Sequence, residues 1–146
     1  MAPPRPVRAD YRVFRPLQTR WMDNDVYGHM NNVVHYSLFD TAVNGWLIDE
    51  GLLDPRKSES YGLVVETGCS YFTEIGFPDT VHAGLRIARI GGSSVRFEVG
   101  LFRNDEESAA AAGFFVHVYV ARSTHRPVQI DGARRAAFET LVMTAA

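Results

Sequence analysis

One short stretch near the N-terminus holds the side chains best suited to chemistry. Asp23 and Asp25 supply carboxylates, His29 supplies an imidazole, and Asn31 and Asn32 follow closely. A carboxylate can activate water or attack a carbonyl carbon, and the amides at the start of a helix can stabilise the resulting oxyanion. If a helix begins directly after this stretch, the sequence therefore predicts an acyl-transfer site.

The helix that would present those amides is predicted immediately downstream. Apolar residues at helical spacing favour a helix from about residue 32 to residue 50: Phe39, Ala42, Val43, Trp46 and Leu47. Asn31 or Asn32 would cap its start because an amide oxygen can accept from a first-turn N–H, and Gly51 would end it. Gly45 lies inside the helix, which we attribute to the close approach of a sheet.

Beyond residue 62 the apolar residues recur at every second position, which predicts β-strands. The alternating segments, with the apolar residues expected to share one face, are 63–71 (Leu63, Val65, Cys69, Tyr71), 81–88 (Val81, Ala83, Leu85, Ile87), 95–101 (Val95, Phe97, Val99, Leu101) and 114–120 (Phe114, Val116, Val118, Val120). Phe115 and Tyr119 would then lie on the second face of the last strand, where they are compatible with a subunit interface.

Two weaker patterns complete the predicted fold. Alternation over residues 11–19, interrupted by Pro16, favours a strand at a sheet edge, and residues 132–141 favour a short terminal helix. One long helix with about five antiparallel strands is an α+β arrangement.

The order of these residues resembles the hotdog-fold thioesterases of the 4-hydroxybenzoyl-CoA thioesterase type. The residues that carry the resemblance are Arg20-Trp21-x-Asp23-x-Asp25-x-x-Gly28-His29-x-Asn31-Asn32, then Tyr36 and Phe39, a Gly-x-Ser-Ser hairpin within 90–95, and the segments 115–120 and 126–130. The resemblance extends from about Tyr11 to about Phe138. It implies a hotdog fold, in which an antiparallel sheet wraps a long central helix, and subunits paired as a homodimer or a dimer of dimers. We expect a flexible tail over 1–9 and a single hotdog thioesterase domain over 10–146.

The resemblance also implies an acyl-CoA thioesterase that releases a free acid and coenzyme A, with an acyl-CoA or aryl-CoA as substrate. Asp25 would be the nucleophile or the general base. Amides around Gly28 would form the oxyanion hole with the helix start, and His29 would orient the thioester or Asp25. In the related plant acyl-carrier-protein thioesterases an asparagine occupies the place of Tyr27, so a three-residue version of the site is not expected here. The candidate substrate-binding residues are Tyr27, Met30, Asn31, Asn32, Glu66, Ser93 and Ser94, and the candidate phosphate-binding cations are Arg89, Arg122 and Arg126.

Other interpretations of the same residues stay open. Asp23 reads best as a structural acceptor of loop amides, although Asp23, Asp25 and His29 are also of suitable type for a metal ion. Hydration of an enoyl-CoA is disfavoured because the Asp-x-Asn-Pro-x-His arrangement of such hotdog proteins is missing. A hotdog protein that binds acyl-CoA without turnover, as a sensor or accessory subunit, is the second alternative. Four further histidines show no informative spacing, and Cys69 reads as a core residue: His35, His82, His117 and His125.

Composition sets the remaining bounds. The chain has 146 residues, of which 46% are apolar and 22% charged, and its formal net charge is −2. Without a basic stripe we expect no nucleic-acid partner, and without a window of about 20 apolar residues we expect no membrane span. The single cysteine excludes an intrachain disulfide, and the N-terminus lacks the apolar core of a signal peptide. We expect a cytoplasmic protein with no cofactor beyond coenzyme A in the substrate and no metal.

Overall fold

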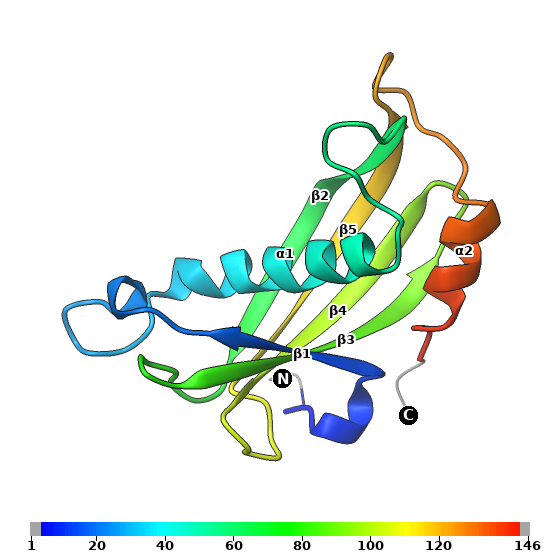
Figure 1. Ribbon diagram of the computed structural model, residues 1–146. Helices are drawn as coiled ribbons and strands as arrows, with labels where there is room; N and C mark the ends of the chain where they lie inside the picture. The colour runs from blue at the N-terminus through cyan, green and yellow to red at the C-terminus, as the bar shows by residue number, and fades with distance from the viewer. Residues whose placement is uncertain (1–3, 144–146) are drawn as a thin grey trace.

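The computed structural model describes residues 4–143, which form one sheet with helices on one of its faces. The strands are β1 (Val13–Gln18), β2 (Ser60–Tyr71), β3 (Thr80–Ile90), β4 (Ser94–Arg103) and β5 (Ala111–Ala121), and the α-helices are α1 (Asn32–Asp49) and α2 (Gly132–Glu139). Two short 3₁₀ turns, η1 (Arg8–Asp10) and η2 (Trp21–Asp23), precede and follow β1. All strand pairs are antiparallel, in the order β1-β3-β4-β5-β2. Figure 1 shows α1 lying across the sheet.

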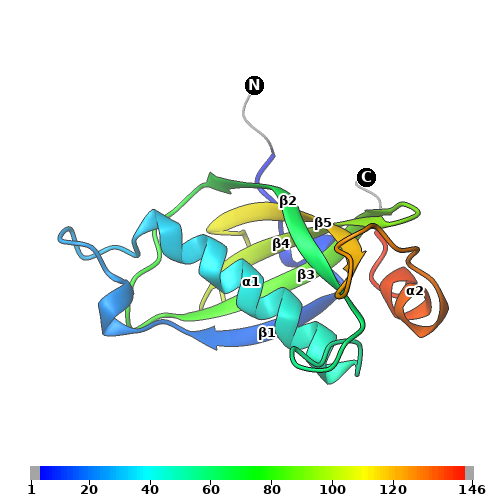
Figure 2. The ribbon, with the colours of Figure 1, turned by 90° about the horizontal axis from the view of Figure 1, so that it is seen from above.

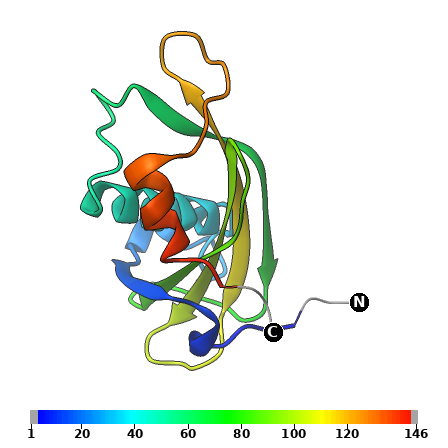
Figure 3. The ribbon, with the colours of Figure 1, turned by 90° about the vertical axis from the view of Figure 1, so that its right-hand side faces the viewer.

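This architecture is the α+β hotdog fold expected from the sequence. Figures 2 and 3 show both helices on the same face of a curved sheet. The core lies between α1 and the central strands, where Phe39, Val43 and Phe97 are fully buried. No helix within residues 4–143 is long and apolar enough to cross a membrane.

The ends of α1 are set as the sequence predicts. Asn31 is the N-cap, and its side-chain oxygen accepts from the amide of Val33 at 3.1 Å. Gly51 follows the helix with a φ of +72°, a conformation that favours glycine. Gly45 leaves room for a side chain rather than for the sheet backbone, because a Cβ there would lie 2.8 Å from the guanidinium of Arg15 on β1.

The predicted faces of β5 are wrong. Phe115, His117 and Tyr119 point to the helix side and are buried, whereas Phe114 on the other face is half-buried. The register with β4 shows which face of β5 points to the helices, because Phe97, a core residue, lies opposite Phe115. Directly opposed residues share a face, so the more apolar set of β5 is turned away from α1.

The alternation predicted for β2 is interrupted by a β-bulge. The register with β5 shifts between Val64 and Glu66, and Val65 is the extra residue. Such a residue reverses the faces on either side of it. Leu63 therefore shares no face with Cys69, contrary to the prediction, and Cys69 packs against the core.

Part of the predicted N-terminal tail packs against the sheet. The Arg5 side chain donates to the carbonyl of Ala109 at 2.7 Å, and Arg8 donates to backbone oxygens of Asn104 and Glu106, both at 2.8 Å. Residues 1–3 of that tail lie outside the described residues.

Candidate active site

The loop from Asn24 to Met30 holds Asp25 in a defined position. The ends of the loop pair as an antiparallel bridge, and the Asp25 amide donates to the carbonyl of His29 at 2.7 Å. Asp25 Oδ1 accepts from the amides of Tyr27 at 2.8 Å and His29 at 3.3 Å. Within residues 4–143 the second oxygen, Oδ2, has no hydrogen-bonding partner. One oxygen is therefore anchored, and the other is available to water or to a substrate.

The backbone amide of Asn32, at the start of α1, is a second free group close to this loop. The carbonyl of Asn32 accepts from the Tyr71 hydroxyl at 3.1 Å and lies 3.2 Å from His35 Nδ1. No acceptor in the described part of the chain faces the Asn32 amide. Because Asn32 is the first residue of the helix, this amide carries part of the positive end of the helix dipole.

The loop amides predicted as oxyanion donors already have acceptors within the chain. The amide of Gly28 donates to the carbonyl of Asp25 at 3.2 Å, and that of Met30 donates to the carbonyl of Ile75 at 2.6 Å. The His29 amide is the one that donates to Asp25 Oδ1. Gly28 has a φ of +83°, so its role here is to allow the tight turn. The helix start is thus the better source of a free donor.

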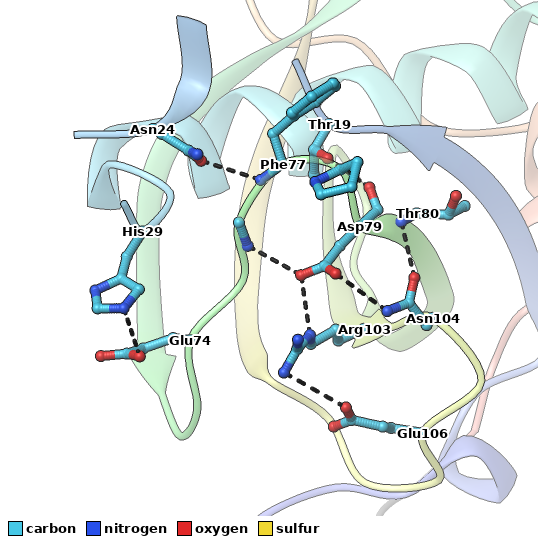
Figure 4. Close-up of polar contacts among 12 residues, drawn as sticks. Thr19, Asn24, His29, Glu74, Phe77, Asp79, Thr80, Arg103, Asn104 and Glu106 are labelled. Atoms are coloured by element: carbon cyan, nitrogen blue, oxygen red, sulfur yellow. Dashed lines mark hydrogen bonds and ion pairs between the residues drawn. The ribbon is translucent and has the colours of Figure 1, made fainter. Parts of the chain in front are cut away.

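A second loop, residues 74–79, fixes the Asp25 loop from outside (Figure 4). Asn24 Oδ1 accepts from the amide of Phe77 at 3.0 Å, and His29 Nε2 lies 2.9 Å from Glu74 Oε2. Asp79 closes this second loop on itself by accepting from the Gly76 amide at 3.0 Å.

Asp79 also joins the second loop to the end of β4. Its carboxylate accepts from Arg103 Nε at 2.9 Å and from the Asn104 amide group at 3.1 Å. The Asp79 side chain is only slightly exposed, whereas that of Arg103 is exposed, so solvent partly screens this ion pair. Side chains far apart in sequence thereby determine where His29 and Asn24 lie.

Asp23 has the structural role that the sequence predicts. It is buried, and its two oxygens accept from the backbone amide and the guanidinium of Arg20 at 2.8 to 3.1 Å. Its carbonyl accepts from the Asn31 amide at 2.8 Å, which ties the loop to the N-cap of α1. Residues 4–143 contain no group of three or more His, Cys, Asp or Glu side chains arranged to hold a metal ion.

A cavity of about 220 Å³ opens beside the helix start. Its walls include Asn32, His35 and Tyr71, together with the His29–Glu74 pair. Burial lowers the pKa of His35, so its imidazole is neutral near pH 7. The cavity therefore offers the neutral His35 ring, the Tyr71 hydroxyl and the Glu74 carboxylate next to the free Asn32 amide.

Comparison with known proteins places this chain in a family. A family model, described as the thioesterase-like superfamily, matches residues 19–138. The chain belongs to the thioesterase-like superfamily.

Three solved structures show how closely other proteins share the fold of this superfamily member. The PA5185 protein from Pseudomonas aeruginosa strain PAO1 is 50% identical, covers 98% of this chain and 100% of its own, and superposes with a TM-score of 0.94. PA2801 from Pseudomonas aeruginosa, a candidate thioesterase, is 25% identical over 85% of this chain and 95% of its own, with a TM-score of 0.78. BH1999, a gentisyl-coenzyme A thioesterase, is 19% identical over 86% of this chain and 99% of its own, with a TM-score of 0.76, which shows the shared fold.

Three predicted contact residues of this thioesterase-like chain lie away from the Asp25 loop. Ser93 and Ser94 follow β3, whose first residue Thr80 lies at the Asp25 end of the sheet. Since β3 has 11 residues, the two ends of the sheet are about 34 Å apart. Glu66 lies opposite Val116 on the face of the sheet away from α1. Within a single chain, none of the three reaches Asp25.

Sequence reasoning missed Tyr71, His35 and Glu74 as parts of the site. Tyr71 and His35 act on the Asn32 carbonyl, and Glu74 acts on His29. Only the position of His35 one turn after Asn32 gave any signal, because residues three apart are neighbours on a helix.

Proposed function

We propose that this protein hydrolyses the thioester of an acyl or aryl group with coenzyme A, using Asp25 and the start of α1. The observation that carries the proposal is the state of Asp25, which has one oxygen anchored by two loop amides and the other free. As a general base, Oδ2 takes a proton from water while the water oxygen bonds to the thioester carbonyl carbon. The C–S bond then breaks, and the thiolate takes up the proton to leave as coenzyme A. As a nucleophile, Oδ2 instead bonds to that carbon and the C–S bond breaks to release the thiolate. Water then hydrolyses the resulting anhydride, which frees the acid, restores the Asp25 carboxylate and supplies the proton that the thiolate takes up.

The Asn32 amide is the proposed oxyanion donor. It stands at the positive end of α1, and Tyr71 and His35 hold its residue in place through the carbonyl. A fixed donor of this kind stabilises the charge that develops on the carbonyl oxygen without having to reorganise. His29, which the Glu74 carboxylate orients, lies on the same loop and would position the thioester.

The proposed active assembly is a homodimer, because the site is open in a single chain. Large apolar side chains beside the site are highly exposed: Trp21 at 77%, Tyr27 at 79% and Val26 at 92%. β2 is an edge strand of the sheet, and Leu63, Val64 and Val65 at its middle are exposed as well. Exposed apolar edges of this kind are ready to pair with another strand.

Pairing of two β2 strands would complete each site from two subunits. Antiparallel pairing about a two-fold axis places the start of one β2 beside the end of the other. The end of β2 carries Tyr71, and the start of β2 lies at the sheet end that carries Ser93. The partner's Ser93 turn would therefore approach Asn32, and exposed arginines at that same end, such as Arg89 and Arg126, would meet the phosphates of coenzyme A.

Release of free thiol from a panel of acyl-CoA and aryl-CoA thioesters tests this proposal. We expect Asp25→Asn to lower kcat by about 10²–10⁴-fold, which is the usual contribution of a positioned general base. Asp105→Asn, in an exposed turn after β4 and with no side-chain hydrogen bond within residues 4–143, is the matched control and should keep full activity. Full activity of Asp25→Asn on the best substrate would contradict the proposal. Tight binding of an acyl-CoA without turnover of any thioester would instead indicate a sensor or accessory subunit.

A further inference from the structure

The segment before β1 is held against the turn between β4 and β5, which spans residues 104–110. The amide of Ala109 donates to the carbonyl of Pro6 at 2.9 Å, and Val7 pairs with Ser108 as an antiparallel bridge. Figures 1 and 3 show this blue segment beside the yellow turn. Backbone contacts therefore fix a part of the chain that the sequence predicts to be a flexible tail.

Arg8 is the side chain through which this segment holds the turn. Its Nη2 donates to the carbonyl of Asn104 and its Nε to the carbonyl of Glu106, both at 2.8 Å. Its Nη1 lies 3.0 Å from Nδ1 of His82, and its guanidinium carbon lies 5.0 Å from the centre of the Phe102 ring. The planar arginine fork can hold two carbonyls at once in a fixed geometry, which the single ammonium of a lysine cannot do.

Asn104 converts the grip of Arg8 into a fixed side-chain direction. Its φ is +52°, in the left-handed region that asparagine tolerates better than most residues. Its amide donates to the carbonyl of Thr80 at 2.7 Å, and its side-chain oxygen accepts from the Thr80 amide at 3.0 Å. The remaining side-chain group donates to the Asp79 carboxylate at 3.1 Å (Figure 4). Loss of Arg8 would therefore loosen the turn that aims Asn104 at Asp79.

Asp79 passes this restraint to the Asp25 loop from two sides. Its carbonyl accepts from the amide of Thr19 at 3.3 Å and from the Thr19 hydroxyl, directly before the chain enters that loop. Its carboxylate holds the Gly76 amide at 3.0 Å. Gly76 packs so closely on the loop that a Cβ there would lie 2.9 Å from the carbonyl oxygen of Gly28. A shift of Asp79 would thus move both the entry to the Asp25 loop and the segment that packs on it.

We propose that Arg8 is a positioning residue for the Asp25 loop, acting through Asn104 and Asp79. The kinetic part of this inference rests on the proposed thioesterase function. Arg8 touches no reacting atom, and its contacts keep Asp25 Oδ2 at a constant distance from the Asn32 amide. A small misplacement of a catalytic group lowers the rate of the chemical step even when the mutation is remote, so the effect falls on kcat.

Amide hydrogen exchange tests the restraint without any need for activity. We expect Arg8→Ala to speed exchange of the Gly76 and Tyr27 amides about fivefold, which is the usual contribution of one hydrogen bond. The amide of Val99, in the core of β4, should exchange at the wild-type rate. Arg12→Ala is the matched control and should leave all three amides unchanged. The Arg12 side chain is exposed, and within residues 4–143 its one hydrogen bond is a 3.4 Å contact with a carbonyl after α2.

A double variant tests whether Arg8 acts through Asn104. Asn104→Gly adopts the positive φ without strain and removes the side-chain contact with Asp79. It should speed exchange at Gly76 by itself, and Arg8→Ala on that background should add little, because the two residues act in series. Fully additive effects would overturn this route. Equal acceleration at Gly76 and at Val99 would show that Arg8 stabilises the whole fold, and would overturn the inference as well.

Kinetics of the same variants separate this inference from the proposed function. On the best thioester we expect Arg8→Ala to lower kcat about fivefold at constant KM, Arg8→Lys to recover part of the loss, and Arg12→Ala to match the wild type. Unchanged exchange at Gly76 in Arg8→Ala, or unchanged kcat, would overturn the positioning role and leave the thioesterase proposal intact. Faster local exchange in Arg8→Ala, without turnover of any thioester by the wild type, would support the restraint and contradict the proposed function.

Discussion

Asn32 contributes two backbone groups to the proposed site, and they have opposite requirements. Its amide must stay free for an oxyanion, and its carbonyl must be held so that the amide does not move. The Tyr71 hydroxyl donates to that carbonyl at 3.1 Å, and His35 Nδ1 lies 3.2 Å from it. This division of roles predicts that a residue on β2 controls the rate although it touches no reacting atom.

Removal of the Tyr71 hydroxyl tests this positioning role. We expect Tyr71→Phe to lower kcat about tenfold, because one hydrogen bond to the Asn32 carbonyl is lost, while KM stays nearly constant. The melting temperature should change little, since the hydroxyl lies at a partly open site. A rise in KM at constant kcat would instead assign Tyr71 to substrate binding.

His117 predicts a characteristic dependence of stability on pH. Its pKa is lowered from 6.5 to about 4 in the folded protein, so between these values the unfolded chain binds more protons. The sign follows directly: stability falls as pH drops from about 6.5 to about 4 and is constant above this window. At 1.36 kcal/mol per pH unit the loss amounts to about 3 kcal/mol.

Urea unfolding of His117→Leu at pH 7 and pH 4.5 measures this contribution. The variant should lose clearly less stability on acidification than the wild type. It should also be more stable by about 1 kcal/mol at pH 7, because a buried polar group without a hydrogen-bonding partner in residues 4–143 is removed. Identical acid sensitivity in both proteins would assign the effect to other groups, of which His35 is the first candidate.

At the residue scale, the sequence shows functional side chains only where they cluster in a recognisable spacing. Asp25 could be proposed as a functional residue because Asp23, Gly28 and His29 surround it within a few positions. Arg8 and Tyr71 could not, because their roles depend on contacts with residues 96 and 39 positions away. The sequence alone gives no sign that the His117 ring lacks a hydrogen-bonding partner within the described residues.

At the scale of elements, the backbone of the fold was predictable and the faces of two strands were not. The limits of α1 and the core alternation of β3 and β4 followed from periodicity and capping residues. The predicted faces of β2 and β5 were wrong for different reasons. β2 contains an extra residue, and β5 is apolar on both faces. In each case only the partner strand fixes the register.

Two glycines in different elements should respond oppositely to replacement by alanine. At Gly45 the new Cβ meets only the mobile end of Arg15, so Gly45→Ala should stabilise the protein by about 0.5 kcal/mol through helix propensity. At Gly113 on β5 the Cβ would meet the backbone oxygen of Gly68 and the ring of Phe39. We therefore expect Gly113→Ala to destabilise the protein by about 2 kcal/mol.

Thermal and urea unfolding of both variants checks this pair. A double variant with Arg15→Ala should show a larger gain from Gly45→Ala, because the clash with the guanidinium is then absent. Loss of stability in Gly45→Ala on that background would show that the helix itself, rather than Arg15, requires the glycine.

At the scale of the whole molecule, the Asp25 loop and the Ser93 turn lie at opposite ends of the sheet. Exposed apolar residues on β2 indicate the edge at which a second copy of the chain would pair and bring these two parts together. We expect Val65→Lys to convert a dimer into monomers and to abolish thioesterase activity, since a charge on an edge strand prevents pairing. Phe14→Lys, on the opposite edge strand β1, should leave the assembly unchanged.

Sedimentation velocity and thiol release measured on the same samples test this prediction. Monomers that retain full activity would show that one chain contains a complete site. A wild-type protein that sediments as a monomer at assay concentrations, yet turns over substrate, would lead to the same conclusion.

The separation of about 34 Å between the Asp25 loop and the Ser93 turn has a genetic consequence. If each catalytic centre draws on both ends of the sheet from different subunits, defects at the two ends can complement each other. A mixed dimer of an Asp25→Asn chain and a chain with a disrupted Ser93 turn would concentrate both defects in one centre and leave the other intact. Two variants that each fail alone would then restore activity when expressed together.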